Sequence, residues 1–369
     1  MSEVIRVLHV TGVPEGGVIG LLLSLHRAID RDAVQFDIVM PDSAPFDSAA
    51  AKLVALGGRA FMSPALRYRN FLKLNAYFDG FFREHPEYRI IHAHGVNTAV
   101  LCLKHAKRNG VPHRICHSHN TKYADYPIRA VRNGLLMRGL GGCATGYMAC
   151  SRAAGEFLFG DKDFVVVRNG IPVSEFAYDA GAREKLRREF NIGNDFVIGN
   201  IGLFRRQKNH AFMIRVLKSY RGLYGEGKLL LVGDGELLDD TKQLAYELGL
   251  REHVVFTGIR RDVAELLSAM DVFLMTSFYE GFGIALIEAL ASGLPCVYSD
   301  TIPSEVQLTD LVHPLSLDDR VDTWVEAIHQ ARYLPRISRI NEIAAKGYDI
   351  SESASKLTEY YHALVSGGS

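Results

Sequence analysis

The sequence predicts an α/β protein with two parallel sheets in two domains. Short apolar segments alternate with amphipathic helical stretches along the whole chain, which is typical of βαβ units. A chain of 369 residues is long enough for two domains of ordinary size. An Asn-Gly pair followed closely by proline, within residues 168–172, favours a domain boundary there because both features form turns.

The first half of the chain supplies the segments of one sheet. Each segment is a short apolar run of strand length. A helix is predicted over Val18–Ile29, directly after the first strand. The strands of this sheet are predicted at Ile5–Thr11, Phe36–Met40, Ile90–Ala93, Arg114–His117, Gly146–Cys150 and Val165–Val167.

The second half repeats the pattern after a charged segment at residues 183–190. A last helix, Ser351–Leu364, follows the aromatic turn at residues 347–348. The two domains are therefore expected at residues 1–170 and 171–350. The strands of the second sheet are predicted at Val197–Ile201, Lys228–Val232, Val254–Thr257, Val272–Met275 and Pro295–Tyr298.

The composition excludes several classes of protein. Lys and Arg number 42 and Asp and Glu number 42, so the absence of net charge argues against a general nucleic-acid binder. The five cysteines show neither metal-ligand nor disulfide spacing, which suits a reducing compartment. No run reaches the roughly 18 apolar residues of a membrane-spanning helix, and the N-terminus carries no apolar signal region. We therefore expect a cytoplasmic protein.

The segment 277–298 carries the most informative motif. Glu280 and Glu288 stand eight residues apart, separated by a glycine-rich turn that leads into an apolar helix. Such a turn exposes backbone N–H groups at the positive end of the helix, which suits a pyrophosphate. A carboxylate within the apolar helix needs a partner, and paired ribose hydroxyls would supply one. The alternative is a solvated Glu280 and a salt-bridged Glu288. The turn residues are Gly281, Phe282 and Gly283.

A cationic loop follows the first strand of the second domain. Its fixed charges, Arg205, Arg206 and Lys208, could stabilise the negative charge of a leaving nucleoside diphosphate. The alternative is an ordinary solvated basic loop. The next two strands end in glycine-containing turns of a common type, and their candidate residues are Gly233, Asp234 and Arg260.

The first domain offers a glycine pair and two histidine pairs at strand ends. Gly16 and Gly17 would let backbone N–H groups approach a phosphate closely, or would simply ease the turn into a helix. Alternating spacing places both members of each histidine pair on one face of a strand. Four imidazoles could bind zinc, as in a metal hydrolase. No acidic ligand follows at a recognisable spacing, so we expect no metal. The pairs are His92 with His94 and His117 with His119.

Together these motifs resemble glycosyltransferase family 4. That family comprises retaining enzymes of the GT-B architecture, in which two Rossmann-like domains face each other across a cleft. The resemblance rests on the E-x7-E signature and on further stretches that occur in the family's order over nearly the whole chain. The stretches MACSRAAGEFLFG and SDTIPSE look most like bacterial members that build exopolysaccharide or capsule. The other matches include HVTGVPEGG, RICHSHNT, VVRNGI, LLLVGDGEL and VVFTGIRRD.

The resemblance implies a role for each motif. Lys208 matches the phosphate-binding lysine, and His119 matches the histidine that reaches the donor sugar. The loop at Gly16 and Gly17 matches the loop that closes over the donor phosphate and the acceptor. Glu280 would contact sugar hydroxyls and Glu288 the ribose. By the same resemblance the turn at Gly233 and Asp234 would lie beside the nucleotide, and Arg260 could lie against the base or form a salt bridge with Asp262. We treat His119, Glu280 and Lys208 as the catalytic candidates.

One position departs from the family's pattern. The arginine that usually follows the glycine of the cationic loop is Leu203 here. Either Arg205 or Arg206 replaces that arginine, or one cation of the phosphate clamp is missing.

The resemblance also implies the substrates. The donor would be a nucleoside-diphosphate sugar, most simply a UDP-sugar, and the acceptor a glycan or a lipid-linked glycan, with no metal or other cofactor. The last helix would pack back on the first domain. The basic amphipathic stretches Pro64–Phe82 and Pro127–Leu140 suit peripheral contact with the inner face of the cell membrane, or are ordinary solvated helices. The alternatives are a UDP-sugar epimerase and a non-catalytic nucleotide-sugar-binding protein.

Overall fold

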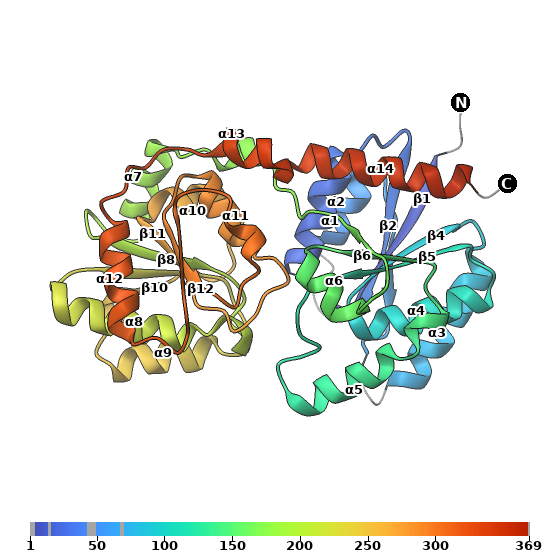
Figure 1. Ribbon diagram of the computed structural model, residues 1–369, viewed down its shortest axis with the longest axis horizontal. Coiled ribbons are helices and arrows are strands. Elements are labelled where there is room, and N and C mark those ends of the chain that lie inside the picture. Colours follow the sequence, from blue (N-terminus) through green and yellow to red (C-terminus); the bar gives the residue numbers. More distant parts are fainter. Residues whose placement is uncertain (1–3, 14–15, 43–48, 67–69, 368–369) are drawn as a thin grey trace. The chain divides into compact units, whose positions relative to one another are not determined.

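The structure, a computed structural model, describes residues 4–13, 16–42, 49–66 and 70–367. The chain divides into two compact units (Figure 1). Unit 1 comprises Met1–Gly170 with Asp349–Ser369, and unit 2 comprises Ile171–Tyr348. Each unit contains one sheet whose strand pairs are all parallel. The protein is therefore an α/β protein with two parallel sheets, as predicted.

The sheet of unit 1 has the strand order β3-β2-β1-β4-β5-β6-β7. This order reverses between β1 and β4, where an open parallel sheet binds its ligands at the carboxyl ends of the strands. The strands are β1 (Ile5–Thr11), β2 (Val34–Pro41), β3 (Ala60–Ser63), β4 (Ile90–His94), β5 (His113–Ser118), β6 (Gly146–Ala149) and β7 (Val165–Val166).

Helices cover both faces of this sheet, with α1, α2 and α14 on one face and α3 and α4 on the other (Figure 1). The C-terminal helix α14 packs against α1. Ile350, Ala354, Leu357 and Tyr361 of α14 lie in the same buried cluster as residues of β1 and β4. The helices are α1 (Gly17–Ala28), α2 (Ala49–Ala55), α3 (Phe71–Glu84), α4 (Val96–Arg108), α5 (Pro127–Met137), α6 (Arg152–Phe159) and α14 (Ile350–Ser366).

The sheet of unit 2 has the order β10-β9-β8-β11-β12-β13 and reverses between β8 and β11. Its core is a separate cluster around Phe204, Tyr220 and Trp324. The strands are β8 (Val197–Ile201), β9 (Lys228–Val232), β10 (Val254–Phe256), β11 (Val272–Met275), β12 (Cys296–Ser299) and β13 (Val312–Leu315). The helices are α7 (Ala180–Glu189), α8 (His210–Tyr224), α9 (Leu238–Glu247), α10 (Val263–Ala269), α11 (Ile284–Ala291), α12 (Val321–Ala331) and α13 (Ile340–Ile343).

Two strands were missed by the sequence analysis. Both β3 and β13 are four-residue strands at the edge of a sheet. Pro314 lies inside β13, a position that proline tolerates only where a ladder hydrogen bond is not required. Such short edge segments carry little apolar periodicity, because they bury less surface than central strands.

Within the described part of the chain, no helix is long and apolar enough to cross a membrane.

Candidate functional site

In unit 2, the loops that follow β8, β9 and β10 are bonded to one another through their backbones. The Phe204 amide donates to the Asp234 carbonyl at 2.9 Å, and the Gly233 amide donates to the Gly258 carbonyl at 2.9 Å. These bonds fix three strand-end loops at the carboxyl edge of the sheet. The predicted cationic loop and the predicted nucleotide turns are therefore neighbours.

Glycine is required where the loop after β9 approaches the loop after β8. A Cβ on Gly233 would lie 2.1 Å from the Gly202 carbonyl oxygen, and one on Gly235 would lie 2.6 Å from the Phe204 carbonyl oxygen. Both glycines also have positive φ angles, of 137° and 154°. The two glycines thus serve close backbone packing, and the exposed Asp234 side chain between them accepts a bond from the Gly235 amide at 2.7 Å.

Lys208 and Glu280, two of the predicted catalytic residues, are brought together. Lys208 Nζ lies 2.6 Å from Glu280 Oε1, and both side chains are largely removed from water. Gln207 Nε2 donates to the Tyr279 carbonyl at 2.9 Å and to Glu280 Oε2 at 3.3 Å. The ammonium group of Lys208 compensates the negative charge of Glu280, because a carboxylate removed from water needs a partner.

The two arginines of the cationic loop project outward from a buried anchor. Phe204 is fully buried and its ring stacks on His210 with the centroids 4.0 Å apart. Arg205 and Arg206 are exposed, and neither guanidinium makes a hydrogen bond or an ion pair with any residue that the structure describes. The loop therefore holds two uncommitted cations beside Lys208.

The turn before α11 has the predicted geometry of a helix entrance. Gly283 has a φ of 98°, and α11 begins at the next residue. The ring of Phe282 is buried and stacks on Tyr348 with the centroids 5.2 Å apart. The first backbone N–H groups of α11 have no partner within the helix and point out of its N-terminus.

Glu288 is a partly buried carboxylate on the apolar helix α11. It forms no ion pair or hydrogen bond through its side chain among the described residues, so the salt-bridged alternative is absent there. Burial raises its pKa from 4.5 to about 7. An uncompensated carboxylate of this kind is poised to accept hydrogen bonds from a ligand.

Arg260 forms the salt bridge that the sequence analysis left open. Its guanidinium lies 2.6 and 2.8 Å from the Asp262 carboxylate and 2.7 Å from Glu189. The hydrogen bonds that Arg260 donates to Asp262 and Glu189 raise the pKa of Arg260 above its ordinary value. A contact of Arg260 with a base stays a prediction.

Two buried polar atoms beside the cationic loop were missed by the sequence analysis. Asn200 Oδ1, at the end of β8, and Ser277 Oγ, just after β11, are buried without a hydrogen-bond partner among the described residues. Such atoms in a native structure need an explanation, and a bound ligand is one. In the sequence, each is a small polar residue at or just after the end of a strand. The two strands are β8 and β11, between which the strand order reverses.

In unit 1, β1, β4 and β5 lie side by side and present a cluster of five histidines. The strand register places His9 beside His92, and His94 beside His117. His119 follows β5 directly. His9 was missed by the sequence analysis, because its position beside β4 depends on strand order and not on local spacing. We call His9, His92, His94, His117 and His119 the histidine cluster.

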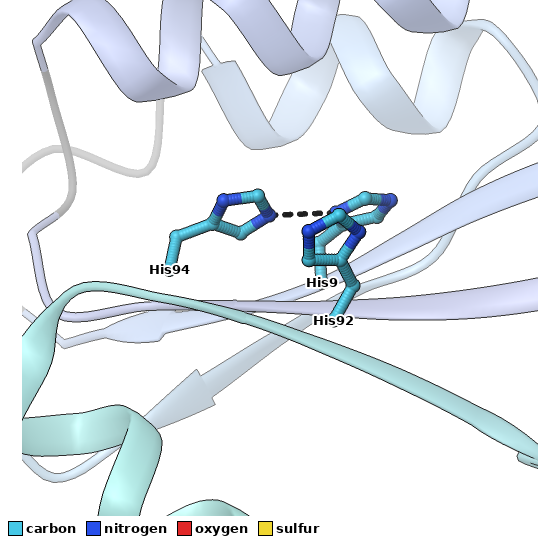
Figure 2. A group of neighbouring side chains, drawn as sticks. All are labelled: His9, His92 and His94. Atoms are coloured by element: carbon cyan, nitrogen blue, oxygen red, sulfur yellow. Dashed lines mark hydrogen bonds between the residues drawn. The ribbon is translucent and has the colours of Figure 1, made fainter. Parts of the chain in front are cut away.

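The rings of the histidine cluster are joined by short hydrogen bonds. His9 Nδ1 lies 2.9 Å from His94 Nε2 (Figure 2), and His94 Nδ1 lies 2.8 Å from His119 Nε2. A second series links Tyr361 Oη to His92 Nδ1 at 2.6 Å and His92 Nε2 to His117 Nδ1 at 3.0 Å. The two series stack on each other, with the closest ring centroids 4.0 Å apart.

Burial keeps these imidazoles neutral. It lowers the pKa of His119 to about 4, and burial together with His26 lowers the pKa of His9 to about 3. Burial, followed by the neighbouring rings, holds the pKa of His92, His94 and His117 well below the ordinary value. Neutral imidazoles can bind a metal, and two groups of three rings have ligand atoms within 4.8 Å of one another.

At the start of α1, Gly16 has a φ of 112°, which a residue with a side chain rarely adopts. Helix α1 begins at Gly17, so the predicted glycine pair forms a helix N-terminus. The preceding residues 14–15 lie outside the described part of the chain.

Comparison with known proteins identifies the family models that match this chain. The model for glycosyl transferases group 1 matches residues 182–335, and the model for glycosyltransferase family 4 matches residues 15–175. Residues 182–335 lie in unit 2, and residues 15–175 lie almost wholly in unit 1.

Individual relatives agree with the family models. A Bacillus subtilis protein named "Putative glycosyltransferase EpsF" is 34% identical over 97% of this chain and 96% of its own length. An Escherichia coli UDP-Gal:α-D-GlcNAc-diphosphoundecaprenol α-1,3-galactosyltransferase is 25% identical over 80% of this chain and 79% of its own. The structure of a sucrose-phosphate synthase from Thermosynechococcus elongatus superposes on this chain with a TM-score of 0.79 at 17% sequence identity. The superposition covers 98% of this chain and 100% of the synthase chain. The fold is GT-B, as the resemblance implied.

Proposed function

Because this chain belongs to the group 1 and family 4 glycosyltransferases, we propose that it transfers a sugar from a UDP-sugar to a glycan or lipid-linked acceptor. Retention at the anomeric carbon is part of the proposal and follows from the family. The cellular role that fits is exopolysaccharide or capsule synthesis. The E. coli relative is named for a UDP-galactose donor and a diphosphoundecaprenol-linked acceptor, which supports this choice of substrates.

One observation carries the proposal: the ion pair of Lys208 with Glu280 lies beside the uncommitted Arg205 and Arg206. A nucleoside diphosphate leaving group develops negative charge, and fixed cations stabilise it without reorganisation. Lys208 and one arginine would bind the pyrophosphate. Glu280, already fixed by Lys208 and Gln207, would accept hydrogen bonds from sugar hydroxyls.

The rest of unit 2 supplies the remaining donor contacts. The turn of Gly281, Phe282 and Gly283 would direct backbone amides and the N-terminus of α11 at the phosphates. Glu288 would accept hydrogen bonds from the ribose hydroxyls, which would compensate its unpaired charge. The glycines at 16 and 17 would bind phosphate or a sugar hydroxyl, and His119 would contact the transferred sugar. No metal or other cofactor is part of this mechanism.

The acceptor side of the proposal rests on α5. Ile128, Val131 and Leu135 share one face of this helix and are exposed by 86%, 65% and 57%. Arg129 and Arg132 are exposed on the same helix. An apolar stripe flanked by arginines suits an anionic membrane surface, where a lipid-linked acceptor would reside.

A two-step experiment tests the proposal. A panel of nucleotide-sugars is first compared by thermal stabilisation, because a ligand that binds the folded state raises the unfolding temperature. UDP-sugars are expected to stabilise the protein, and the stabilising donor is then incubated with a polyprenyl-diphosphate-linked glycan. Extension of the glycan by one sugar supports transfer. Release of a free epimerised sugar without acceptor would indicate an epimerase, and binding without turnover a non-catalytic sensor.

A further inference from the structure

The histidine cluster contains a directional chain of three rings, from His9 through His94 to His119. A neutral imidazole has one N–H donor and one bare acceptor nitrogen. His94 uses both of its nitrogens, one toward His9 and one toward His119. If His94 donates in one of these hydrogen bonds, it must accept in the other. The tautomer of His9 therefore determines the tautomer of His94, which in turn determines that of His119.

Within this series of three hydrogen-bonded rings, only one ring nitrogen of His119 is left to bind a ligand. Its Nε2 is hydrogen-bonded to His94 Nδ1 at 2.8 Å. Its Nδ1 is buried and has no hydrogen-bond partner among the described residues. His9 Nε2, at the other end of the three-ring series, is also buried and has no hydrogen-bond partner among the described residues. A buried ring nitrogen without a partner is costly, so a ligand that pairs with it is favoured.

We propose that His94 and His9 are positioning residues that fix the ring of His119, so that Nδ1 is the nitrogen offered to the ligand. This inference rests on the proposed function, which gives His119 the transferred sugar as its ligand. If His9 donates to His94, then His94 donates to His119 Nε2, and His119 Nδ1–H donates to a sugar oxygen. If the two bonds run the opposite way, His119 Nδ1 accepts from a sugar hydroxyl.

The second series supports the first by packing. The ring of His117 lies 4.0 Å from the ring of His119, at an interplanar angle of 26°. His117 is bonded to His92, which is bonded to Tyr361 of α14. The orientation of the His119 ring is therefore restricted in two ways. His117 stacks on its face, and His94 is hydrogen-bonded to its edge.

A metal centre is the competing interpretation of the same rings. Both nitrogens of His92 and both of His94 are already hydrogen-bonded to other side chains. A metal would have to replace some of these bonds, and no carboxylate belongs to either three-histidine group. The hydrogen-bonded arrangement therefore favours positioning over metal binding.

Ring-nitrogen NMR of the intact protein with ¹⁵N-labelled histidine tests the chain directly. Without ligand, His94 and His119 are each expected to show one protonated and one bare nitrogen, joined by a His94–His119 hydrogen-bond coupling. This result does not depend on the identity of the donor, so it can fail separately from the proposed function. Addition of the stabilising nucleotide-sugar should shift the His119 Nδ1 signal and leave the coupled Nε2 signal nearly in place. A ligand-induced shift at Nε2 with loss of the coupling would overturn the inference.

Two variants of His94 separate positioning from simple packing. H94A removes both bonds, whereas H94N can retain a bond to His119 because an asparagine amide reaches about as far as Nδ1. H94A is expected to lower kcat/KM for the nucleotide-sugar by roughly tenfold or more, the effect of one lost bond in a buried network. Affinity for UDP alone should not change, and H94N should recover much of the loss. The control is H113A, on the neighbouring strand β5 outside the cluster.

Two outcomes would contradict positioning. One is equal activity of H94A and H94N, with both variants folded. The other is stoichiometric zinc binding by the wild type that H94A abolishes, because this would identify a metal centre. If H94A does not fold, H94N and the NMR of the wild-type protein still decide the question.

Discussion

At the scale of single residues, the unpaired carboxylate of Glu288 gives the sharpest prediction. Glu288→Gln should weaken UDP binding by roughly 1.5–3 kcal/mol, because a hydrogen bond to a charged group is replaced by one to a neutral amide. Calorimetry measures the affinity. Glu326→Gln, an exposed position on α12, is the control and should bind UDP as the wild type does. Unchanged affinity of Glu288→Gln would show that the carboxylate does not contact the ligand.

The same residue predicts a pH dependence of stability without ligand. The folded-state pKa of Glu288 is about 7, above its ordinary 4.5, so ionisation of this group lowers the free energy of unfolding as pH rises from 4.5 through 7. Glu288→Gln should therefore stabilise the protein by roughly 1–2 kcal/mol at pH 8, and by little at pH 4, after allowance for partial exposure. Denaturant unfolding at both pH values measures the difference. Equal stability at pH 8 would mean that the carboxylate is solvated or paired.

Single alanine variants decide which cation replaces the arginine missing at Leu203. Lys208→Ala and one of Arg205→Ala and Arg206→Ala should each lower turnover about tenfold or more, because a single lysine leaves much of the pyrophosphate charge unpaired. Arg251→Ala, exposed in the same unit, is the control. Loss of turnover in Lys208→Ala with neither arginine affected would remove the arginines from the mechanism.

The candidate site shows what sequence alone can supply at this scale. The residues of the E-x7-E motif and of the cationic loop were found from local spacing, and the structure brings Lys208 and Glu280 within 2.6 Å. His9 was not found, because its approach to His94 depends on the pairing of β1 with β4, far along the chain. The same holds for Tyr361, whose contact with His92 joins residues 269 positions apart.

At the scale of elements, the exposed stripe of α5 predicts membrane affinity. Ile128→Asn combined with Leu135→Asn should reduce binding to vesicles of anionic phospholipid, because it removes the apolar surface that would insert. Sedimentation with vesicles measures binding. Leu223→Asn, an exposed apolar position on α8, is the control. Equal binding by the double variant and the wild type would show that α5 is an ordinary solvated helix.

Most elements of both sheets could be predicted, because central strands combine strand length with continuous apolar composition. The first and second strands of the chain illustrate this: β1 has its predicted bounds, and β2 is longer than predicted by a few residues. The edge strands β3 and β13 could not be found. Edge position alone is not the reason, because the edge strands β7 and β10 were predicted. In β13 the strand pattern is interrupted by Pro314.

Considered as a whole molecule, the protein is a glycosyltransferase whose two units each have their own sheet and core. The sheet of unit 2 presents fixed cations, backbone amides and Glu288, and these groups are proposed to meet the donor without a divalent ion. The sheet of unit 1 presents the histidine cluster. Metal independence is therefore the property of the whole molecule that the proposal predicts.

Product analysis in the presence of a strong chelator tests metal-independent sugar transfer. The wild-type protein is incubated with a UDP-sugar, a polyprenyl-diphosphate-linked glycan and an excess of chelator, and the products are identified by mass spectrometry. We expect a glycan longer by one sugar, with one UDP released per transfer, at the rate seen without chelator. Loss of transfer on chelation, restored by added zinc or manganese, would contradict metal-independent transfer.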